Sequence, residues 1–469
     1  MPGIASYGAY VPLTRLPLAM IAGRPAQEDG PEKAVAYYDE DAVTMAVAAA
    51  IDCLGDLDRG AVDGVLFAST TYPLREKQGA ALIAKALDLR RDVSTADHAG
   101  SLRAGTAALE SALHSIAAGG ARNVLVVASD CRMGAPRGAL ESRLGDGAVA
   151  FLVSESGEIA HFEASHAVAD EIQDQWRVEG EAFTHSWEDR FIVQEGYTPN
   201  LTAAVRGLLA KTGHSPTDFA RTALYAPDAR ALAGAARKLG LSDEQVQDPF
   251  FGRMGNTGTP FALMLLAAAL EGATPGQRLL VASYGDGAHA LCFETTGAIE
   301  KLEPRRGVSW HLSRRRPLRS YDSYLESRHL GAKEWAAGAD IGLSATIRFR
   351  ERDADIGFVA AKCRACGRVH FPKPRVCGKC FAKDEWTPHR LSDRRGVLLS
   401  YTFDHFFPAS EPPTTVIMTE VDGCRVQVQL ANASPEQVRL DMPVEFVFRK
   451  IHEAGGKPNY FWKASPIDV

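Results

Sequence analysis

Four cysteines in the last quarter of the chain carry the clearest chemical signal. They form two Cys-x2-Cys pairs, Cys363/Cys366 and Cys377/Cys380, with ten residues between the pairs. Two such pairs can present four thiolates tetrahedrally, which is the arrangement that structural zinc requires. Because protein ligands fill all four positions and leave none for water, we predict a structural zinc ion rather than a catalytic one. We expect His370 on the surface of this zinc ribbon and not as a ligand.

The remaining cysteines form no spaced framework and are scattered along the chain, at Cys53, Cys131, Cys292 and Cys424. This usage indicates a reducing, cytosolic environment rather than a disulfide-stabilised secreted protein. The N-terminal MPGIASYGAY lacks the charged region and apolar run of a signal peptide. The longest near-continuous apolar stretch, residues 261–270, is about half a membrane span. We therefore expect a cytoplasmic protein without a membrane anchor.

Length and composition set further limits. A chain of 469 residues is consistent with two to four domains. Its residues are 46% apolar and 23% charged, so it can bury a large core. The 52 basic and 58 acidic residues give a net charge of −6, which argues against a grip of the whole chain on nucleic acid or on an anionic membrane.

An internal repeat organises the first 300 residues, which we divide into halves at 1–165 and 166–300. Each half contains Gly-Thr, an apolar segment of helical length, a Gly or Pro break, a strand, and a Gly-Asp-Gly-Ala turn before another strand. The two turns start 140 residues apart, at Gly145 and Gly285. Segments that are apolar nearly all round belong in an interior, and unbroken Val/Leu strands are buried on both faces. The repeat predicts a duplicated α/β unit whose two central helices lie between sheets.

The pattern changes after residue 300. Residues 301–345 have little apolar periodicity and predict a linker with one or two short helices. Its clustered arginines are expected on a solvated or interdomain face, with phosphate contact as the alternative: Arg305, Arg306, Arg314, Arg315, Arg316 and Arg319. From residue 346, short strands separated by turn residues are typical of a small barrel or sandwich. We assign the zinc ribbon to 346–390 and the all-β part to 391–469.

These motifs give the chain a resemblance to known families. Its first 300 residues resemble the thiolase superfamily, nearest to archaeal and bacterial hydroxymethylglutaryl-CoA synthases, in AGTAAL, SDCRMGAPRGALESRLGDGAVAFLVSE, MGNTGTP and LLVASYGDGAHA. Residues 346–469, ending in YFWKASP, resemble the zinc-ribbon and OB-fold proteins that accompany thiolase-like acyl-CoA enzymes. The resemblance implies a layered αβαβα thiolase-like fold, then a rubredoxin-like zinc ribbon and an OB barrel. It also implies an acyl-CoA substrate, with coenzyme A as part of it.

The resemblance locates an active site at which this chain departs from the family. In hydroxymethylglutaryl-CoA synthases a cysteine opens the central helix in a pattern like Cys-Lys-Ala-Gly-Thr, and Leu102 stands there in this chain. The family's His-x-Pro-Asn is matched by Tyr-Ala-Pro-Asp, which puts Tyr225 at the histidine position. Thr70 stands for the acid/base glutamate, and only the asparagine survives, as Asn256. Since leucine is no nucleophile, this alignment excludes an acyl-enzyme formed at that position.

A cysteine-less thiolase fold could still make or break a C–C bond beside a CoA thioester. Retro-aldol cleavage of a β-hydroxyacyl-CoA needs a base for the β-hydroxyl proton and donors for the enolate oxygen. Tyr225 is the candidate base or proton relay, with Asn256 and Tyr284 on neighbouring loops, and His98 is the alternative base. Packing is the alternative role for both tyrosines, as a structural role is for His98. We expect substrate or CoA contacts from Ser101, Arg103, Thr257 and Asp228.

Three other functions stay open. The chain could be a degenerate subunit that works in Claisen-type or acyltransfer chemistry with a cysteine-bearing thiolase partner. It could instead bind acyl-CoA without catalysis. Nucleic-acid binding is the least favoured, although the OB part offers aromatic side chains for base stacking at Tyr401, Phe403, Phe406 and Phe407. The resemblance implies a homodimer or a mixed oligomer with a thiolase-like subunit.

One aromatic-rich segment, residues 170–200, has two interpretations. It could wall an apolar pocket for a bulky acyl group, or it could pack in a dimer interface. Its large side chains are Trp176, Phe183, Trp187, Phe191 and Tyr197.

Overall fold

The computed structural model describes residues 2–330, 345–406, 412–454 and 457–467. The chain divides into two compact units. Unit 1 comprises Met1–Tyr37, Asp41–Ala84 and Leu89–Tyr324, and unit 2 comprises Tyr38–Glu40, Lys85–Asp88 and Leu325–Val469. Among the described residues, no helix combines the length and the apolar character that crossing a bilayer requires.

Unit 1 is built on one mixed sheet whose strand order is β11-β12-β13-β8-β1-β7-β6-β4-β5. The strands of the first half are β1 (Gly3–Tyr10), β4 (Gly64–Ala68), β5 (Ser94–His98), β6 (Asn123–Cys131) and β7 (Asp146–Ser154). Those of the second half are β8 (Ala160–Ala169), β11 (Phe219–Leu224), β12 (Arg278–Tyr284) and β13 (Gly287–Thr295). The halves meet where β1 pairs with β8 over two residue pairs.

The two halves repeat one topology. In the first, β4 lies parallel to β5 and β6, and β7 runs antiparallel between β6 and β1. In the second, β11 lies parallel to β12, and β13 runs antiparallel between β12 and β8. An isolated parallel bridge from Thr222 to Val246 takes the place that β5 has in the first half. The predicted duplicated α/β unit is confirmed, and β8 begins at Ala160.

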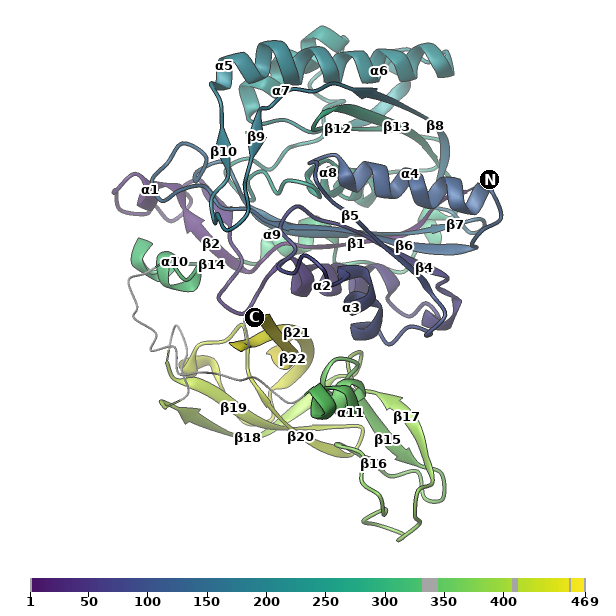
Figure 1. Cartoon of the computed structure of the whole chain (residues 1–469), viewed down its shortest axis with the longest axis vertical. Helices are drawn as coiled ribbons and strands as arrows, with labels where there is room; N and C mark the ends of the chain where they lie inside the picture. The colour runs from purple at the N-terminus through teal and green to yellow at the C-terminus, as the bar shows by residue number, and fades with distance from the viewer. Residues whose placement is uncertain (1, 331–344, 407–411, 455–456, 468–469) are drawn as a thin grey trace. The chain divides into compact units, whose positions relative to one another are not determined.

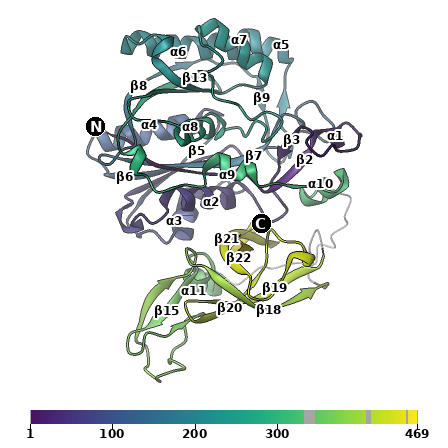
Figure 2. The ribbon, with the colours of Figure 1, turned by 180° about the vertical axis from the view of Figure 1, so that it is seen from behind.

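Helices and sheet halves alternate in layers (Figures 1 and 2). The central layer holds α4 (Ala104–Ala117) and α8 (Phe261–Glu271). The outer helices are α2 (Ala42–Leu54) and α3 (Gly79–Ala86) on one side, and α6 (Thr198–Thr212) and α7 (Ala229–Leu239) on the other, while α9 (Gly307–Ser313) packs against β1 and α8. Every residue of α8 except Ala268 and Glu271 is buried, as expected for a helix that is apolar nearly all round. The αβαβα arrangement is thus confirmed.

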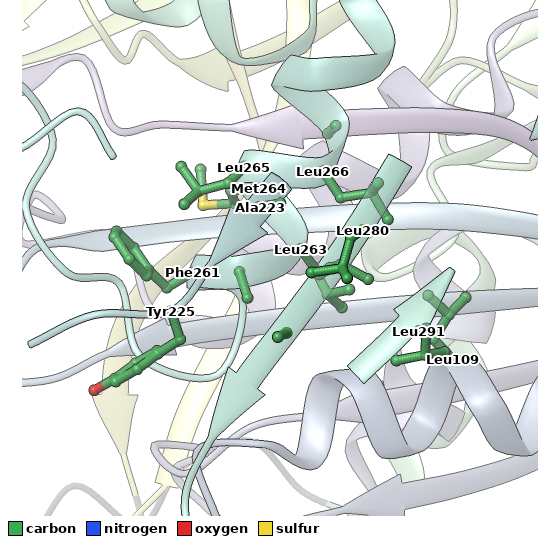
Figure 3. Close-up of a cluster of buried hydrophobic side chains, with 14 of the residues drawn as sticks. Leu109, Ala223, Tyr225, Phe261, Leu263, Met264, Leu265, Leu266, Leu280 and Leu291 are labelled. Atoms are coloured by element: carbon green, nitrogen blue, oxygen red, sulfur yellow. The ribbon is translucent and has the colours of Figure 1, made fainter. Parts of the chain in front are cut away.

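The core between the sheet halves is formed by these two helices and the strands beside them. Figure 3 shows Leu109 of α4 beside Leu291 of β13, and Leu263 of α8 beside Leu280 of β12. All four side chains are at most 2% exposed. This packing fixes the N-terminal ends of both central helices, where the sequence placed the candidate site.

Shorter elements complete unit 1. A three-stranded sheet joins β2 (Thr14–Pro17), β3 (Glu32–Ala34) and β14 (Arg316–Pro317), and a small hairpin joins β9 (Gln175–Trp176) and β10 (His185–Ser186). The remaining helices are α1 (Leu18–Ile21), α5 (Asp189–Phe191) and α10 (Tyr321–Ser327), the π-helical η2 (Ile192–Tyr197), and the 3-10 turns η1 (Arg59–Ala61), η3 (Pro216–Asp218) and η4 (Ile299–Lys301).

The arginine-rich segment is integrated into unit 1 as far as β14. The guanidinium groups of Arg306 and Arg314 lie 4.5 and 4.2 Å from the ring centre of Trp310. Arg315 Nε lies 3.3 Å from Glu32 Oε1. These cations are used in local contacts, because cation–π and ion-pair partners are supplied by the segment itself and by β3. The later part of the predicted linker, residues 331–344, falls outside the described residues.

Unit 2 is mostly β-structure. Helix α11 (Ala345–Asp355) precedes the ribbon strands β15 (Val359–Cys363), β16 (Val369–His370) and β17 (Trp386–Arg390). A five-stranded sheet follows in the order β20-β19-β18-β21-β22, formed by β18 (Gly396–Asp404), β19 (Thr414–Val421), β20 (Cys424–Gln429), β21 (Pro443–Ala454) and β22 (Lys457–Pro466), with the 3-10 turn η5 (Pro435–Gln437). A bridge from Leu430 to Ala464 nearly closes it into a barrel. The predicted ribbon and OB-type barrel are confirmed.

Aromatic residues fill the barrel core rather than a base-stacking platform. Trp462 is fully buried and stacks on Phe358 with ring centres 5.8 Å apart. Of the aromatic residues suggested for base stacking, Tyr401 and Phe403 contact each other at 5.4 Å and Phe406 is exposed. Phe407 falls outside the described residues.

Candidate active site and zinc cluster

A cavity of about 990 Å³ lies at the N-terminal end of α4. Its walls come from the loops after β4, β5 and β6, from the turn between β12 and β13, and from residues 171–184. The carboxyl ends of neighbouring strands are the usual place for ligands in open α/β sheets. The aromatic-rich segment contributes part of the wall. Among the described lining residues, Trp176 is the one of its five large aromatic residues, together with charged residues such as Asp174 and Arg177.

The start of α4 forms part of this wall. Leu102 and Ser101 line the cavity, two and three residues before the helix begins at Ala104. The turn after β12 approaches so closely that a Cβ on Gly285 would lie 2.8 Å from Ser101 Oγ and 2.9 Å from Leu102 N. Only glycine fits there. The position that the resemblance assigns to an acyl-accepting cysteine is thus in the cavity wall and carries an isobutyl group.

His98 ends β5 and also lines the cavity. Burial lowers its pKa, with the carboxylate of Asp97 acting in the opposite direction. The imidazole is therefore neutral at pH 7 and can accept a proton. Asp97 itself accepts hydrogen bonds from the N–H groups of Gly79 and Ala80 at 2.6 and 2.8 Å, so it stabilises the start of α3.

Thr70 is committed to a buried carboxylate that the sequence analysis did not single out. Asp130, at the end of β6, is fully buried. It accepts hydrogen bonds from the hydroxyl groups of Ser69, Thr70 and Thr71 and from the main-chain N–H groups of Thr70 and Thr259. Thr70 Oγ1 donates at 2.9 Å, so its hydroxyl organises the loop. The signal was present in the sequence as an Asp at a strand end and a run of hydroxyl residues.

Tyr225 and Asn256 meet at a smaller pocket whose other wall residues include Gln175 and Asp228. The Asn256 amide is oriented by two main-chain bonds, since Nδ2 donates to Ala226 O and Oδ1 accepts from Gly258 N, each at 2.9 Å. Burial raises the pKa of Tyr225, whereas the Arg132 guanidinium and the Asn256 amide lower it. Gln175 lines both this pocket and the large cavity, so the two spaces adjoin.

Tyr284 ends β12, and its ring packs with those of Tyr225 and Tyr197. Its ring centre lies 6.1 Å from that of Tyr225 and 5.6 Å from that of Tyr197. Burial raises its pKa far above the usual range, and the carboxylate of Asp174 raises it further. Asp174 raises the pKa of both tyrosines, and Arg132 opposes this effect at Tyr225. Figure 3 shows the Tyr225 hydroxyl directed away from the leucine core.

Arg132 is the second residue that sequence reasoning missed. It follows β6 by one residue, lines the large cavity and is 6% exposed. Its Nη2 donates to Gln175 Oε1 at 2.7 Å, and its Nη1 has no hydrogen-bond partner among the described residues. A single arginine after a strand resembles many surface arginines, so its sequence context carries little signal.

The other predicted contact residues are placed differently. Asp228 lines the smaller pocket and caps α7 by accepting from Ala231 N at 2.9 Å. Arg103 Nη1 donates to Val168 O at 3.3 Å, and the buried Thr257 hydroxyl lies 3.4 Å from Met264 Sδ. Arg103 and Thr257 are not among the described residues that line either space. Their predicted substrate contacts stay predictions.

In unit 2 the four ribbon cysteines converge, with all four Sγ atoms within 4.8 Å of one another. The Cys363–Cys380 and Cys366–Cys377 Sγ pairs are each 3.6 Å apart. Tetrahedral zinc with Zn–S bonds of about 2.3 Å requires sulfur atoms about 3.8 Å apart, so the cluster fits zinc. Main-chain N–H groups of Cys380 and Lys379 help to lower the pKa of Cys377 to about 5, which favours the ligating thiolate.

His370 lies nearer to this cluster than expected. Its Nε2 is 3.4 Å from Cys377 Sγ, and its ring packs against Trp386. It is half-buried, and the expectation that it is no ligand stays a prediction. β16 pairs with β15, which carries Cys363, and this pairing brings the imidazole alongside the cysteines. A second group, Glu163, His214 and Cys292, also has clustered ligand atoms, but its carboxylate is paired with Arg278 at 3.2 Å.

Comparisons with known proteins identify the family of unit 1. The hydroxymethylglutaryl-CoA synthase of Aeropyrum pernix is 34% identical over 343 residues, which cover 70% of this chain and 94% of that protein. That of Pyrococcus horikoshii is 31% identical over 336 residues, covering 70% of this chain and 95% of that protein. The chain belongs to the hydroxymethylglutaryl-CoA synthase family.

Solved structures support the same fold. An HMG-CoA synthase in complex with CoA superposes with a TM-score of 0.63 at 23% identity, covering 71% of this chain and 91% of that one. MvaS in complex with 3-hydroxy-3-methylglutaryl coenzyme A gives 0.62 at 23%, covering 73% and 95%. In unit 2, residues 350–385 match the ChsH2 rubredoxin-like zinc ribbon domain and residues 389–449 match the ChsH2 C-terminal OB-fold domain. This member of the hydroxymethylglutaryl-CoA synthase family thus carries two additional domains of a second family.

Proposed function

We propose that this chain makes or breaks a C–C bond beside the thioester of a β-hydroxyacyl-CoA by an aldol-type reaction without an acyl-enzyme. The observation that carries the proposal is Leu102 in the cavity wall at the start of α4. A family member without a nucleophile at this position still retains a large cavity and a polar group around Tyr225. Chemistry that needs proton transfer but no covalent intermediate fits both facts.

In the cleavage direction a base removes the proton of the β-hydroxyl group. The bond between the α- and β-carbons then breaks, its electron pair forms the enolate of the shorter acyl-CoA, and a carbonyl compound leaves. Protonation of the enolate α-carbon completes the balance. Tyr225 is the proposed base, because the neighbouring cation of Arg132 favours its ionised form. His98 is the alternative, since it is neutral and lines the cavity.

Tyr284 is the proposed hydrogen-bond donor. Burial and Asp174 keep its hydroxyl protonated, so it can donate to a developing oxyanion or return a proton. Burial raises the pKa of both tyrosines, but Arg132 opposes this rise at Tyr225 whereas Asp174 adds to it at Tyr284, and on this difference we assign Tyr225 as the base and Tyr284 as the donor. Asn256 is held by main-chain bonds and is the proposed donor that, with Tyr284, stabilises the enolate oxygen.

Coenzyme A enters the proposal through the relatives. The two superposed synthase structures are described as complexes with CoA and with 3-hydroxy-3-methylglutaryl coenzyme A. By analogy, the cavity of about 990 Å³ would receive the acyl end of a CoA ester, with Ser101 among the contacts. The four cysteines would hold zinc as a structural ion that takes no part in the reaction. A homodimer or a mixed oligomer is proposed on the family resemblance.

Product analysis tests the proposal. The purified chain is incubated with a series of 3-hydroxyacyl-CoA esters in the absence of free CoA, and both products are quantified. We expect an aldehyde or ketone and a shorter acyl-CoA in equal amounts. A requirement for free CoA, or its release, would instead indicate thiolase or synthase chemistry. Binding of CoA esters without turnover, alone or with a cysteine-bearing partner, would support the acyl-CoA-binding function.

A further inference from the structure

The guanidinium of Arg132 is buried without a counter-ion. No carboxylate of the described residues lies within 4.0 Å of it, its neighbours are the neutral Gln175 amide oxygen and the Tyr225 hydroxyl, and its Nη1 has no hydrogen-bond partner among these residues. The nearest acidic neighbour in sequence, Asp130, already accepts five hydrogen bonds from the loops around it. A buried cation without an anion costs several kcal/mol in general, so an unpaired one needs a reason.

Packing does not supply that reason. The Arg132 stem lies against Gly258, where a Cβ would be only 2.6 Å from Arg132 Cδ. Gly258 has φ +78°, so this close approach depends on a residue without a side chain. An apolar side chain would fill the same space at lower cost. The fold therefore makes room specifically for a long side chain that brings a charge to the cavity.

The position of the charge indicates its partner. Arg132 lines the cavity that Leu102 and Ser101 also line, and it is close to the Tyr225 hydroxyl. We propose that Arg132 binds the oxygen on the β-carbon of the acyl group, so that the chain selects CoA esters oxygenated at that carbon. This inference rests on the proposed function and names the determinant of its substrate class. An N–H donor with no protein partner would then be satisfied by the ligand.

Binding measurements test the inference without turnover. Dissociation constants are measured calorimetrically for 3-hydroxybutyryl-CoA and butyryl-CoA, which differ only in the β-oxygen, under conditions or times in which no product forms. For the wild type we expect at least about tenfold tighter binding of the oxygenated ester, as for a hydrogen bond to a charged group. In Arg132→Gln the two esters should bind about equally, with butyryl-CoA affinity unchanged within about twofold.

Two further variants keep the test decisive. Arg132→Lys retains the charge but not the planar guanidinium, and it should keep part of the preference for the oxygenated ester. This variant serves as the test if Arg132→Gln fails to fold. Arg177→Gln is the matched control, because Arg177 lines the same cavity but donates to Thr70 O at 2.9 Å. It should change the affinity for both esters by the same factor.

Each outcome separates the two claims. If wild type binds neither ester, the proposed function and this inference both fail. If it binds both and Arg132→Gln keeps the preference for the oxygenated ester, the inference alone is overturned. Glutaryl-CoA, which has a terminal carboxylate and no β-oxygen, tests whether Arg132 recognises a carboxylate instead. If it binds tighter than 3-hydroxybutyryl-CoA and loses that advantage in Arg132→Gln, the arginine recognises a terminal carboxylate and the assignment to the β-oxygen is wrong.

Discussion

Removing only the hydroxyl of Tyr225 separates its proposed chemical role from its packing. The ring contacts Phe261, Tyr197 and Tyr284 at centroid distances of 5.7, 6.5 and 6.1 Å, and phenylalanine keeps all three contacts. Proton transfer by a positioned side chain contributes roughly 10²–10⁴-fold. We therefore expect kcat on a β-hydroxyacyl-CoA to fall by that factor in Tyr225→Phe, which corresponds to about 2.7–5.5 kcal/mol of barrier.

The free energy of unfolding should change much less, by about 0.5–1.5 kcal/mol, the usual worth of one hydrogen bond. Initial rates by product quantification and chemical unfolding measured on the same preparation give both values. Tyr197→Phe is the matched control, since its hydroxyl donates to Tyr225 O at 2.8 Å in the same aromatic group. It should lose stability by a similar amount and keep most of the rate. Equal rates for wild type and Tyr225→Phe would refute the assignment and move the proposed base to His98.

Three further predictions follow from the charges and ligands. Purified protein should contain about one zinc per chain by metal analysis. Cys377→Ser should lose the zinc and unfold the ribbon, since the free energy of metal binding in such sites supplies the free energy of folding. An ordered ribbon without zinc would contradict this. The Glu110 pKa is lowered to about 2, first by His289, whose Nε2 lies 3.4 Å from Glu110 Oε1. Its stabilisation is therefore complete above the ordinary value of 4.5 and is lost as pH falls from 4.5 toward 2, and Glu110→Gln should flatten that part of the stability–pH curve. Because Tyr225 must lose a proton to act as a base and burial raises its pKa, kcat/KM should rise with pH, and Arg132→Gln should move this rise to higher pH.

The fold could be predicted because its signals are local and repeated. The Gly-Asp-Gly turns and the apolar central segments mark corresponding places in both halves, and α8 is buried nearly all round as its composition requires. The zinc cluster follows from spacing alone. The division between the halves has no such signal, because β8 follows β7 through a short turn at 155–159 without a change in composition.

The site could be predicted only where a position matched the family pattern. Leu102, Tyr225 and Asn256 were chosen by aligning the chain with that pattern, and their roles stay predictions. Asp130 and Arg132 were missed, because what distinguishes them is their tertiary surroundings. A buried carboxylate with five donors and a guanidinium with a free N–H cannot be recognised from their neighbours in sequence.

The assignment of opposite roles to Tyr225 and Tyr284 has the same origin. It depends on Arg132 and Asp174, which come from separate loops and meet these rings only in the fold. The arginine-rich segment is a similar case. Its composition suggested a solvated linker, whereas β14 pairs with β2 and several of the cations find partners within unit 1.

The central claim is that the chain handles acyl-CoA without an acyl-enzyme. Intact-mass measurement of the protein, taken after incubation with acetyl-CoA and again during turnover of a β-hydroxyacyl-CoA, tests it most directly. The account predicts an unmodified protein mass at every time point while the shorter acyl-CoA and the carbonyl product accumulate together. A mass increase equal to an acyl group, mapped to Ser101 or to any cysteine, would contradict the account and return the chain to covalent chemistry.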